Sequence, residues 1–291
     1  MKHINNTGDQ DWKKEQEDFF RQVKTPFEDD STAIWEKLST QIDEQDAAKH
    51  QPTAQETKVV SIFRLRNIAA AACVLLLAGI GFMKFYTVDI ITTNGQQLAH
   101  TLPDGSVVQL NAQSNLNYAP YWWTFDRSIK FEGEAFFKVE KGQKFRVISS
   151  LGSTQVLGTQ FNILARGETY KVYCTEGKVE VRASGGKQIL KPNQLAVLEN
   201  KGLKRENDVP ENKAIAWTQQ KFNFMGSNIT FKDIIEELER QYDVELQYDP
   251  ALVNTSRGGA FDKPATIEEC LDKLDIQFTK IQEGKYKLSV E

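Results

Sequence analysis

The feature that most constrains this chain is a run of sixteen consecutive apolar or small residues, Ile68 to Met83. Extended to residues 67–86, the run is twenty residues long, which as a helix covers about 30 Å, the thickness of a bilayer's hydrocarbon core. No charge lies near its centre, and it lacks the polar face that a helix packed in a soluble core usually shows. It also starts too far from the first residue to be a secretory signal peptide. The sequence therefore predicts one transmembrane helix, 67–86.

Positive charge on the two sides of this run is unequal, and it predicts the orientation. After Lys84 no Lys or Arg occurs until Arg127. The residues shortly before the run include four basic ones, Lys49, Lys58, Arg64 and Arg66. By the positive-inside rule, residues 1–66 lie in the cytoplasm and residues 87–291 lie outside it.

Composition excludes several classes of function. The formal net charge is -4, and neither side of the apolar run is basic, so direct binding to nucleic acid is not expected. The three cysteines, Cys73, Cys174 and Cys270, are far apart in sequence and have no neighbouring histidine, which disfavours a disulfide framework and the usual zinc sites. We therefore expect no metal and no cofactor. Cys174 and Cys270 lie in apolar patterns, and we favour two buried free thiols over one bridge.

Residues 1–66 contain two amphipathic patterns. Large apolar side chains recur at helical spacing on either side of Pro26. They are Trp12, Phe19 and Phe20 in the first pattern, and Ile34, Trp35, Leu38 and Ile42 in the second. Helices this short are marginal alone, so we expect their apolar faces to dock in a groove of a cytoplasmic protein. A helical hairpin that closes on itself is the alternative. The polar stretch 41–57 reads as a tether to the membrane.

Residues 87–203 change to short alternating runs separated by turns, as in SVVQL, SIKF, AFFKVE, FRVIS and QFNILA. Turn sequences such as PDGS at 103–106 and SGGK at 184–187 mark the breaks. This pattern predicts an all-β domain, either a sandwich or barrel-like. The aromatic cluster Tyr121, Trp122 and Trp123 is expected to help fill the core, with an exposed contact platform as the alternative.

The rest of the chain predicts a small second domain. Residues 204–214 form a polar linker, and residues 215–291 alternate between strand and helix patterns. Thr230 with Asp233, and Thr266 with Glu269, have the spacing of capping boxes for two helices. We expect a small α+β domain built from two strand-helix units, a βαβ-type repeat.

Five blocks follow one another in the outer region: LPDGSVVQLNAQSNLNY at 102–118, FEGEAFFKVEK at 131–141, FRV at 145–147, VLGTQFNI at 156–163 and EGKVEV at 176–181. In this order they resemble the periplasmic domain of FecR-type anti-sigma factors. The C-terminal region resembles the domain found on many such proteins, which is similar to the short N-terminal domain of secretins and TonB-dependent receptors. The fold class expected is therefore a multidomain single-pass membrane protein with a short α-helical cytoplasmic segment, an all-β periplasmic domain and a small α+β domain.

The resemblance also implies partners and a location. Such proteins are anchored in the inner membrane, hold an extracytoplasmic-function (ECF) sigma factor with their cytoplasmic segment, and read the signalling domain of a TonB-dependent outer-membrane transporter in the periplasm. It implies that the apolar residues of segment 1–66 bind the sigma factor, and that envelope proteases release the segment. A β-augmentation contact between the C-terminal domain and the transporter is a further expectation.

The resemblance also places a self-cleavage site at Gly158 and Thr159. A Thr hydroxyl can attack the carbonyl before it in an N-to-O acyl shift, and a Gly there tolerates the strained backbone. The alternative is a tight bend at Gly158 followed by an ordinary strand residue.

Two other functions fit the sequence less well. An anchored enzyme is disfavoured because the outer region has one histidine, His100, and no recognisable catalytic motif, so we expect no enzyme beyond self-cleavage. A membrane-anchored carbohydrate-binding or envelope assembly module that uses Tyr121 to Trp123 would leave the apolar faces of segment 1–66 unexplained.

Overall fold

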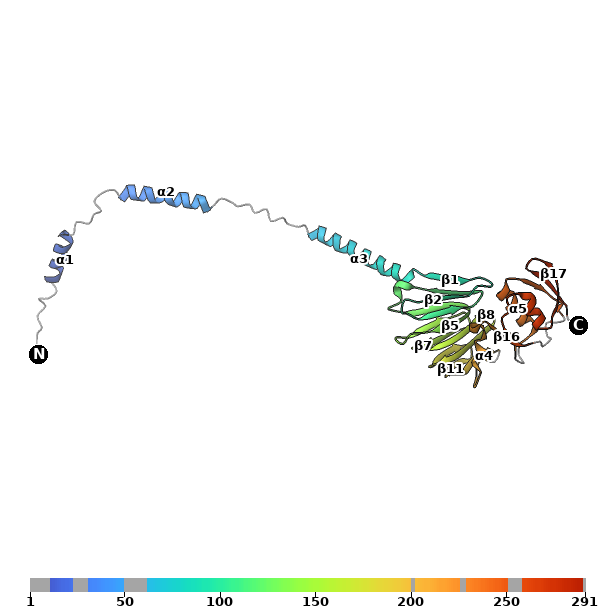
Figure 1. Ribbon diagram of the computed structural model, residues 1–291. Helices are drawn as coiled ribbons and strands as arrows, with labels where there is room; N and C mark the ends of the chain where they lie inside the picture. The colour runs from blue at the N-terminus through green and yellow to red at the C-terminus, as the bar shows by residue number, and fades with distance from the viewer. Residues whose placement is uncertain are drawn as a thin grey trace, which may run out of the picture. The chain divides into compact units, whose positions relative to one another are not determined.

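The computed structural model describes residues 11–22, 31–49, 62–199, 202–225, 229–250 and 258–289 (Figure 1). The chain divides into two units, Met1–Arg66 and Asn67–Glu291. In the first unit the described residues include helices α1 (Asp11–Gln22) and α2 (Ser31–Lys49), as the two amphipathic patterns predict. The tether prediction was wrong for residues 41–49, because α2 continues through them.

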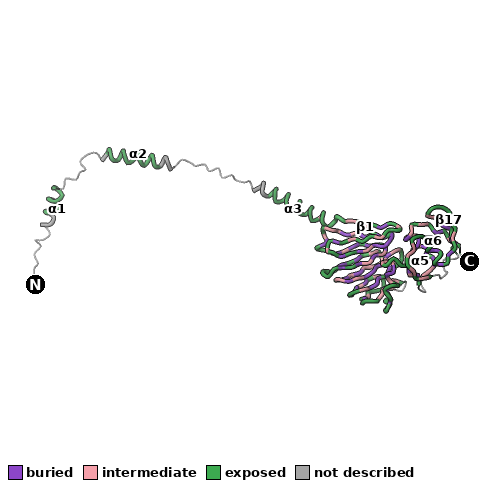
Figure 2. Tube along the Cα trace, viewed as in Figure 1, coloured by how far each residue is buried: buried purple, intermediate pink, exposed green. Residues whose placement is uncertain are grey.

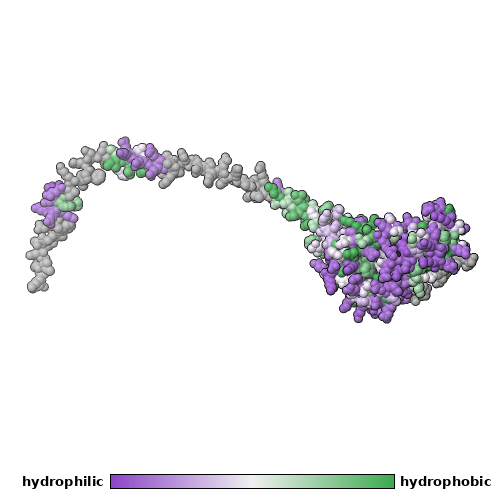
Figure 3. Space-filling model, viewed as in Figure 1, coloured by the Kyte–Doolittle hydropathy of each residue, from purple (hydrophilic) through white to green (hydrophobic). Residues whose placement is uncertain are grey.

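Helix α3 (Ile62–Phe85) contains the apolar run. Its stretch Arg66–Phe85 is long and apolar enough to cross a membrane, and it is the one such helix among the described residues. None of that stretch is buried, and its hydrophobic side chains are open to their surroundings (Figures 2 and 3). The helix begins five residues earlier than the predicted span and ends one residue earlier, although the Tyr86 N–H still donates to the Phe82 carbonyl (2.9 Å).

The outer region begins with a nearly barrel-shaped β domain of two sheets that share strand β5 (Arg127–Lys138). The first sheet has the order β1-β4-β5-β6-β7-β10-β11. Its other strands are β1 (Val88–Thr92), β4 (Ser114–Tyr118), β6 (Phe145–Ile148), β7 (Gly152–Val156), β10 (Val179–Ala183) and β11 (Gly186–Leu190).

The second sheet has the order β2-β3-β5-β8-β9-β12-β13. Its other strands are β2 (Leu98–Thr101), β3 (Val107–Leu110), β8 (Gln160–Arg166), β9 (Thr169–Glu176), β12 (Gln194–Glu199) and β13 (Gly202–Glu206). Side chains connect β11 and β13, since the Gln188 amide donates to the Leu203 carbonyl (3.3 Å).

Strand β5 bends at Gly133 and passes from one sheet to the other. The sequence pattern had suggested two separate strands, SIKF and AFFKVE, but they are halves of one strand. Its first half pairs with β4 and β6, and its second half pairs with β3 and β8. Gly133 has φ +115°, and a Cβ atom there would lie 2.4 Å from the Ser114 Oγ. Only glycine can therefore occupy the bend.

Odd-numbered residues of β5 point into the core along its whole length. Phe131 and Phe137 meet edge to face with ring centroids 5.6 Å apart, and Phe137 stacks on Phe161 of β8 at 5.0 Å. Phe131 is next to the first sheet and Phe137 to the second, so one strand joins both layers of the core. Such ring pairs add about 1 kcal/mol each to the free energy of burial.

The aromatic cluster divides between core and surface. Trp123 is 4% exposed and packs edge to face on Tyr118 and Phe145, with ring centroids 5.5 and 5.8 Å apart. Trp122 is half-buried, and Tyr121 is 53% exposed. The core interpretation is thus right for Trp123 and wrong for Tyr121.

The predicted polar linker 204–214 is structured and packs on the β domain. Strand β13 extends through Glu206, and a short helix α4 (Glu211–Ala214) follows, then the 3-10 turn Ala216–Gln219. Val209 and Ile215 are buried against Tyr173, whose hydroxyl donates to the Val209 carbonyl (3.1 Å). The apolar residues within and just after the polar stretch determine this packing.

The C-terminal module has the two strand-helix units expected. The first contains β14 (Lys221–Asn223), α5 (Phe231–Tyr242) and β15 (Glu245–Gln247). The second contains β16 (Ala260–Asp262), α6 (Ile267–Lys273), β17 (Gln277–Gln282) and β18 (Lys285–Ser289). Strands pair between the units, β14 with β16 and β15 with β18, and β17 pairs with β18 inside the second unit, so the first unit forms no sheet of its own.

Both helices of this module begin at the predicted threonines. Thr230 and Asp233 form a complete capping box, in which each side chain accepts from the other residue's backbone N–H. Thr266 accepts from the Glu269 N–H at 3.3 Å, the half of the box that the structure shows. The caps start α5 and α6 so that their apolar faces enter a shared core of this module.

We predict that Gly133→Ala lowers the thermal unfolding midpoint of the full chain far more than Gly167→Ala does. Both glycines have positive φ, but a Cβ at Gly167 meets nothing within 4 Å, whereas one at Gly133 overlaps the backbone and side chain of Ser114. We expect a loss of about 3 kcal/mol or more at Gly133 and about 1 kcal/mol at Gly167. Calorimetry on the purified protein measures both. Equal losses would contradict the role of this bend.

Candidate functional site

The first candidate site is the apolar faces of α1 and α2. On α2, Ile34, Leu38 and Ile42 are spaced by four residues and therefore lie on one face, with Trp35 beside them. On α1, Phe19 and Phe20 are in edge-to-face contact at 5.8 Å. The Trp12 side chain lies outside the described residues, although its backbone is in α1.

These side chains are exposed, with Trp35 at 68% and Phe20 at 69%. The others that the structure describes are also exposed: Phe19, Ile34, Leu38 and Ile42. Exposed rings of this size are more often binding anchors than surface filling, because leaving them in water forgoes roughly 2 kcal/mol each. The arrangement can therefore bind an apolar groove.

The second candidate site is Gly158–Thr159, in the turn between β7 and β8. Gly158 has φ +144°, and a Cβ there would lie 2.7 Å from the Lys141 Cα, so the fold requires glycine at this position. Thr159 is 5% exposed, and its hydroxyl has no hydrogen-bond partner in the described part of the chain. A buried hydroxyl without a partner is uncommon. The turn thus fits the tight-bend interpretation and also leaves a hydroxyl free for chemistry.

The third candidate site is a polar junction between the β domain and the C-terminal module, which sequence reasoning missed. Its centre is Glu134, on β5 directly after the Gly133 bend. One carboxylate oxygen of Glu134 accepts from the Asn111 amide (2.9 Å), and the other accepts from the Asn162 amide (3.0 Å). Each asparagine in turn contacts a residue of the C-terminal region.

Two N–H groups, which can donate a hydrogen bond but cannot accept one, fix the orientation of the asparagine side-chain amides. The Asn162 Oδ1 accepts from the Trp217 indole N–H (3.3 Å), and the Asn111 Oδ1 accepts from the Ala112 backbone N–H (2.9 Å). Both amide NH2 groups must then face Glu134. The junction therefore requires an acceptor oxygen toward each asparagine, which the two oxygens of a carboxyl group provide and an amide does not.

Helix α5 closes the junction from the other side. The Gln241 amide donates to Asn111 Oδ1 (2.8 Å) and to Glu237 (2.9 Å), and the Lys263 ammonium donates to Gln241 Oε1 (2.8 Å). A backbone hydrogen bond also connects the β domain to α5, because the Gly95 N–H donates to the Arg240 carbonyl (2.6 Å). Because most of these groups are at least half-buried, a movement of α5 would break several hydrogen bonds at once.

The charges around Glu134 perturb its protonation. Burial raises the pKa of the Glu134 carboxyl, and the nearby Glu237 carboxylate raises it further, while the two asparagine amides and Arg166 act in the opposite direction. Arg166 is held by the carbonyls of Ala112 (2.7 Å) and Gln113 (3.1 Å). The net effect is a carboxyl that resists ionisation at the centre of the junction.

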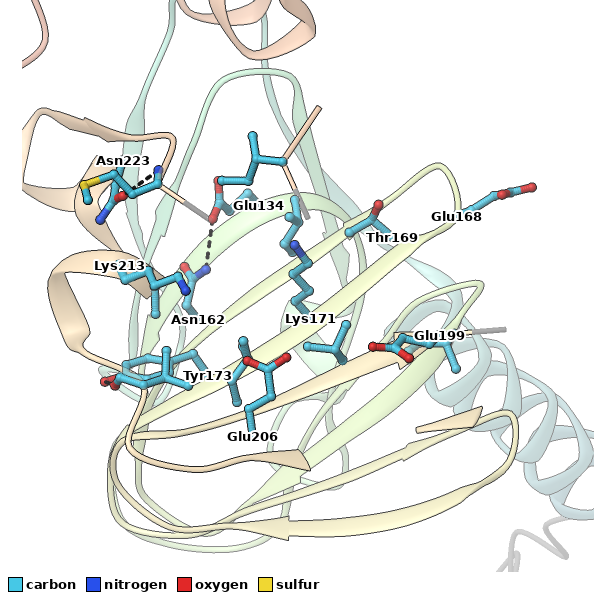
Figure 4. A pocket seen from close by; sticks show the side chains of 18 residues that line it. Glu134, Asn162, Glu168, Thr169, Lys171, Tyr173, Glu199, Glu206, Lys213 and Asn223 are labelled. Atoms are coloured by element: carbon cyan, nitrogen blue, oxygen red, sulfur yellow. Dashed lines mark hydrogen bonds between the residues drawn. The ribbon is translucent and has the colours of Figure 1, made fainter. Parts of the chain in front are cut away.

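Glu134 and Asn162 also line a groove of about 670 Å³ (Figure 4). Its walls carry both signs of charge, from Lys171, Lys213, Glu199 and Glu206, together with the ring of Tyr173. Within the described residues there is no cluster of three or more His, Cys, Asp or Glu that could hold a metal ion. The groove leaves the junction open to solvent on one side.

The remaining candidate residues have structural roles. Cys174 and Cys270 are buried and free, as predicted, and burial raises the pKa of each thiol to about 11, which keeps it protonated and unreactive. His100 is half-buried on β2 and bonds the Tyr118 hydroxyl at 3.0 Å. That contact accounts for its position without a catalytic role.

Two family models match the outer region. The one described as "FecR protein" matches residues 88–180, and the one described as "FecR, C-terminal" matches residues 223–286. Together they cover more than half of the chain. The chain belongs to the FecR family. The first match lies within the β domain and includes Glu134 and Gly158, and the second contains α5 with Gln241.

Solved structures agree with this assignment. Two crystal structures of a candidate anti-sigma factor from Parabacteroides distasonis, at 2.50 and 1.65 Å resolution, are each 29% identical to this chain, with TM-scores of 0.62 and 0.63. The similar region covers 71% and 70% of this chain, and 100% and 99% of those chains. No curated protein matches this chain.

We predict that Glu134→Gln weakens the junction and removes part of its pH dependence. The new NH2 group would face one of the two asparagine amides, at a cost of roughly 1 to 3 kcal/mol. The pKa of this carboxyl is higher in the folded protein than its ordinary value of 4.5. Its contribution to the free energy of unfolding is therefore fully present below pH 4.5 and is lost as the pH rises through the raised pKa. The difference between wild-type and variant unfolding free energies should therefore change with pH in that window.

Thermal unfolding of the full chain from pH 4 to 8 measures this difference. Glu176→Gln is the matched control, because Glu176 also accepts from a side-chain amide, that of Gln160 (2.6 Å), but is exposed. A pH profile of Glu134→Gln that is parallel to the wild-type profile would show that Glu134 is not the titrating group.

Proposed function

We propose that this chain is a single-pass inner-membrane anti-sigma factor whose cytoplasmic helices α1 and α2 hold an ECF sigma factor until its periplasmic region receives a signal. The exposed apolar face of α2 is the observation that carries this proposal. Family membership supports the anti-sigma role, and the apolar stretch Arg66–Phe85 supports the anchor. The asymmetry of basic residues around that stretch supports the orientation.

We further propose that the signal comes from a TonB-dependent outer-membrane transporter and enters through the C-terminal module. Among the described residues, strand β17 pairs with β18 alone and is an edge of its sheet, and it is exposed almost throughout, with Ile281 at 49%. An exposed edge strand can add a strand from a partner protein. From there the junction around Glu134 connects α5 to β5, the strand that both sheets share.

The carbohydrate-binding alternative loses its main support. It required Tyr121, Trp122 and Trp123 to form one exposed platform. Trp123 instead fills the core, and Tyr121 contacts the rings of Phe82 and Tyr86 at 6.0 and 5.3 Å.

Sigma-factor capture tests the proposal directly. We predict that full-length protein solubilised from membranes retains an ECF sigma factor, and that Trp35→Ala or Leu38→Ala weakens this capture by roughly 30-fold or more, as the loss of a binding anchor of 2 kcal/mol would. Thr40→Ala is the matched control, because Thr40 is exposed on the opposite face of α2. Retention that is equal in all three variants would rule out this face.

Self-cleavage at Gly158–Thr159 is proposed as part of the same mechanism. The Thr159 Oγ would attack the Gly158 carbonyl carbon as the peptide C–N bond breaks, and water would then hydrolyse the ester to give fragments 1–158 and 159–291. The fragments would stay associated, because β7 pairs with β10 and β5 pairs with β8 across the cut. Cleavage would thus cut the backbone of the β domain while its two fragments remain paired.

We predict that Thr159→Val abolishes cleavage without loss of stability, because the hydroxyl it removes has no hydrogen-bond partner in the described structure. Full-length protein tagged at both ends and immunoblotted would show two fragments for wild type and Thr159→Ser, and a single species for Thr159→Val. A single full-length species for the active wild-type protein would exclude self-cleavage.

A further inference from the structure

The turn between β4 and β5 exposes aromatic side chains next to the end of α3. Phe125 is 67% exposed and Tyr121 is exposed by more than half, although an aromatic core lies directly beneath them. Trp122 is half-buried and contacts Phe125, with ring centroids 4.7 Å apart. These three residues, Tyr121, Trp122 and Phe125, are called the aromatic turn below.

The fold holds the aromatic turn in this orientation. Trp123 is inserted into the core between Tyr118 and Phe145, so its neighbours along the chain must point outward. Backbone hydrogen bonds tighten the turn, since the Phe125 and Asp126 N–H groups both donate to the Trp122 carbonyl (2.9 and 3.1 Å). The backbone conformation of the turn therefore determines this exposure, and rotation of the side chains alone would not bury the rings.

Contacts with α3 set the position of the aromatic turn relative to the apolar stretch. The Tyr121 ring lies 6.0 Å from the Phe82 ring and 5.3 Å from the Tyr86 ring. Phe82 is in the last turn of Arg66–Phe85. A side chain in contact with Phe82 must lie at nearly the same depth, so once α3 spans the bilayer, Tyr121 reaches the boundary between acyl chains and headgroups.

The chemistry of this surface matches that boundary. Trp and Tyr concentrate at the membrane interface because each has an apolar body and a polar tip. The Lys84 ammonium lies 6.0 Å from the centre of the Trp122 ring, where it can extend toward lipid phosphates. No Lys or Arg interrupts residues 85–126, and the carboxylate that follows Phe125, Asp126, is neutralised by the Arg146 guanidinium, which donates to it at 2.9 Å.

We propose that the aromatic turn is a lipid-binding surface that immerses in the headgroup layer and holds the β domain against the membrane. This inference rests on the proposed membrane anchoring by α3. Because the turn leads directly into β5, lipid contact fixes the first end of the strand that both sheets share. A second protein is not required to cover these rings.

The test uses full-length protein reconstituted into phosphatidylcholine and phosphatidylglycerol vesicles, with and without bromine on the upper part of the acyl chains, which quenches nearby tryptophan fluorescence. The intensity lost to brominated lipid should be smaller in Trp122→Phe than in wild type. It should be unchanged in Trp217→Phe, because Trp217 is half-buried and bonded to Asn162. The Phe substitution keeps an aromatic ring, so the turn should fold normally.

Two negative results are distinguishable. If sodium carbonate extracts the wild-type protein from the vesicles, α3 does not span the bilayer, and both the anchoring and the lipid-binding surface are wrong. If the protein stays in the vesicles but Trp122→Phe loses as much intensity to brominated lipid as wild type does, α3 is inserted and the aromatic turn is not in the headgroup layer.

Discussion

The outer region depends on a single strand that belongs to two sheets. Strand β5 can pair with β4 and β6 in its first half and with β3 and β8 in its second only because Gly133 adopts a backbone angle and a closeness to Ser114 that no other residue tolerates. The side chains before and after the bend, Phe131 and Phe137, then meet in one core. The residue directly after the bend, Glu134, is where the C-terminal module is bonded to the β domain through Asn111 and Asn162.

This arrangement suggests how a signal could pass through the outer region. The β5 strand begins at the turn beside α3 and reaches the junction with α5 at its middle. A partner that moves the C-terminal module would therefore act on a network of half-buried hydrogen bonds attached to the same strand that leads back to the membrane. Coupling of this kind needs two discrete arrangements of the junction. Neighbouring groups shift the pKa of the Glu134 carboxyl in opposite directions, so a small change in their positions can alter the hydrogen bonds of the junction.

Periodicity and turn chemistry predicted most of the local structure. The apolar run, the two amphipathic helices, the alternating strands and the Thr230 and Thr266 caps depend on neighbours in sequence, and the structure contains them all. The junction could not be predicted in this way. Asn111, Glu134, Asn162 and Gln241 are polar residues separated by up to 130 positions, and only the pairing of β3, β5 and β8 brings the first three together. The division of the aromatic cluster was missed for a similar reason, because which ring enters the core depends on how tightly the turn closes.

In the mechanism that we propose, everything begins with a sigma factor held on the exposed apolar faces of α1 and α2. Hydrogen–deuterium exchange of the full-length protein, with and without a bound ECF sigma factor, tests it most directly. Short helices with unpartnered faces should exchange rapidly alone, and binding should slow exchange in residues 11–22 and 31–49 by at least tenfold while the β domain stays unchanged. Exchange in both helices that is equally fast with and without the sigma factor would contradict the account.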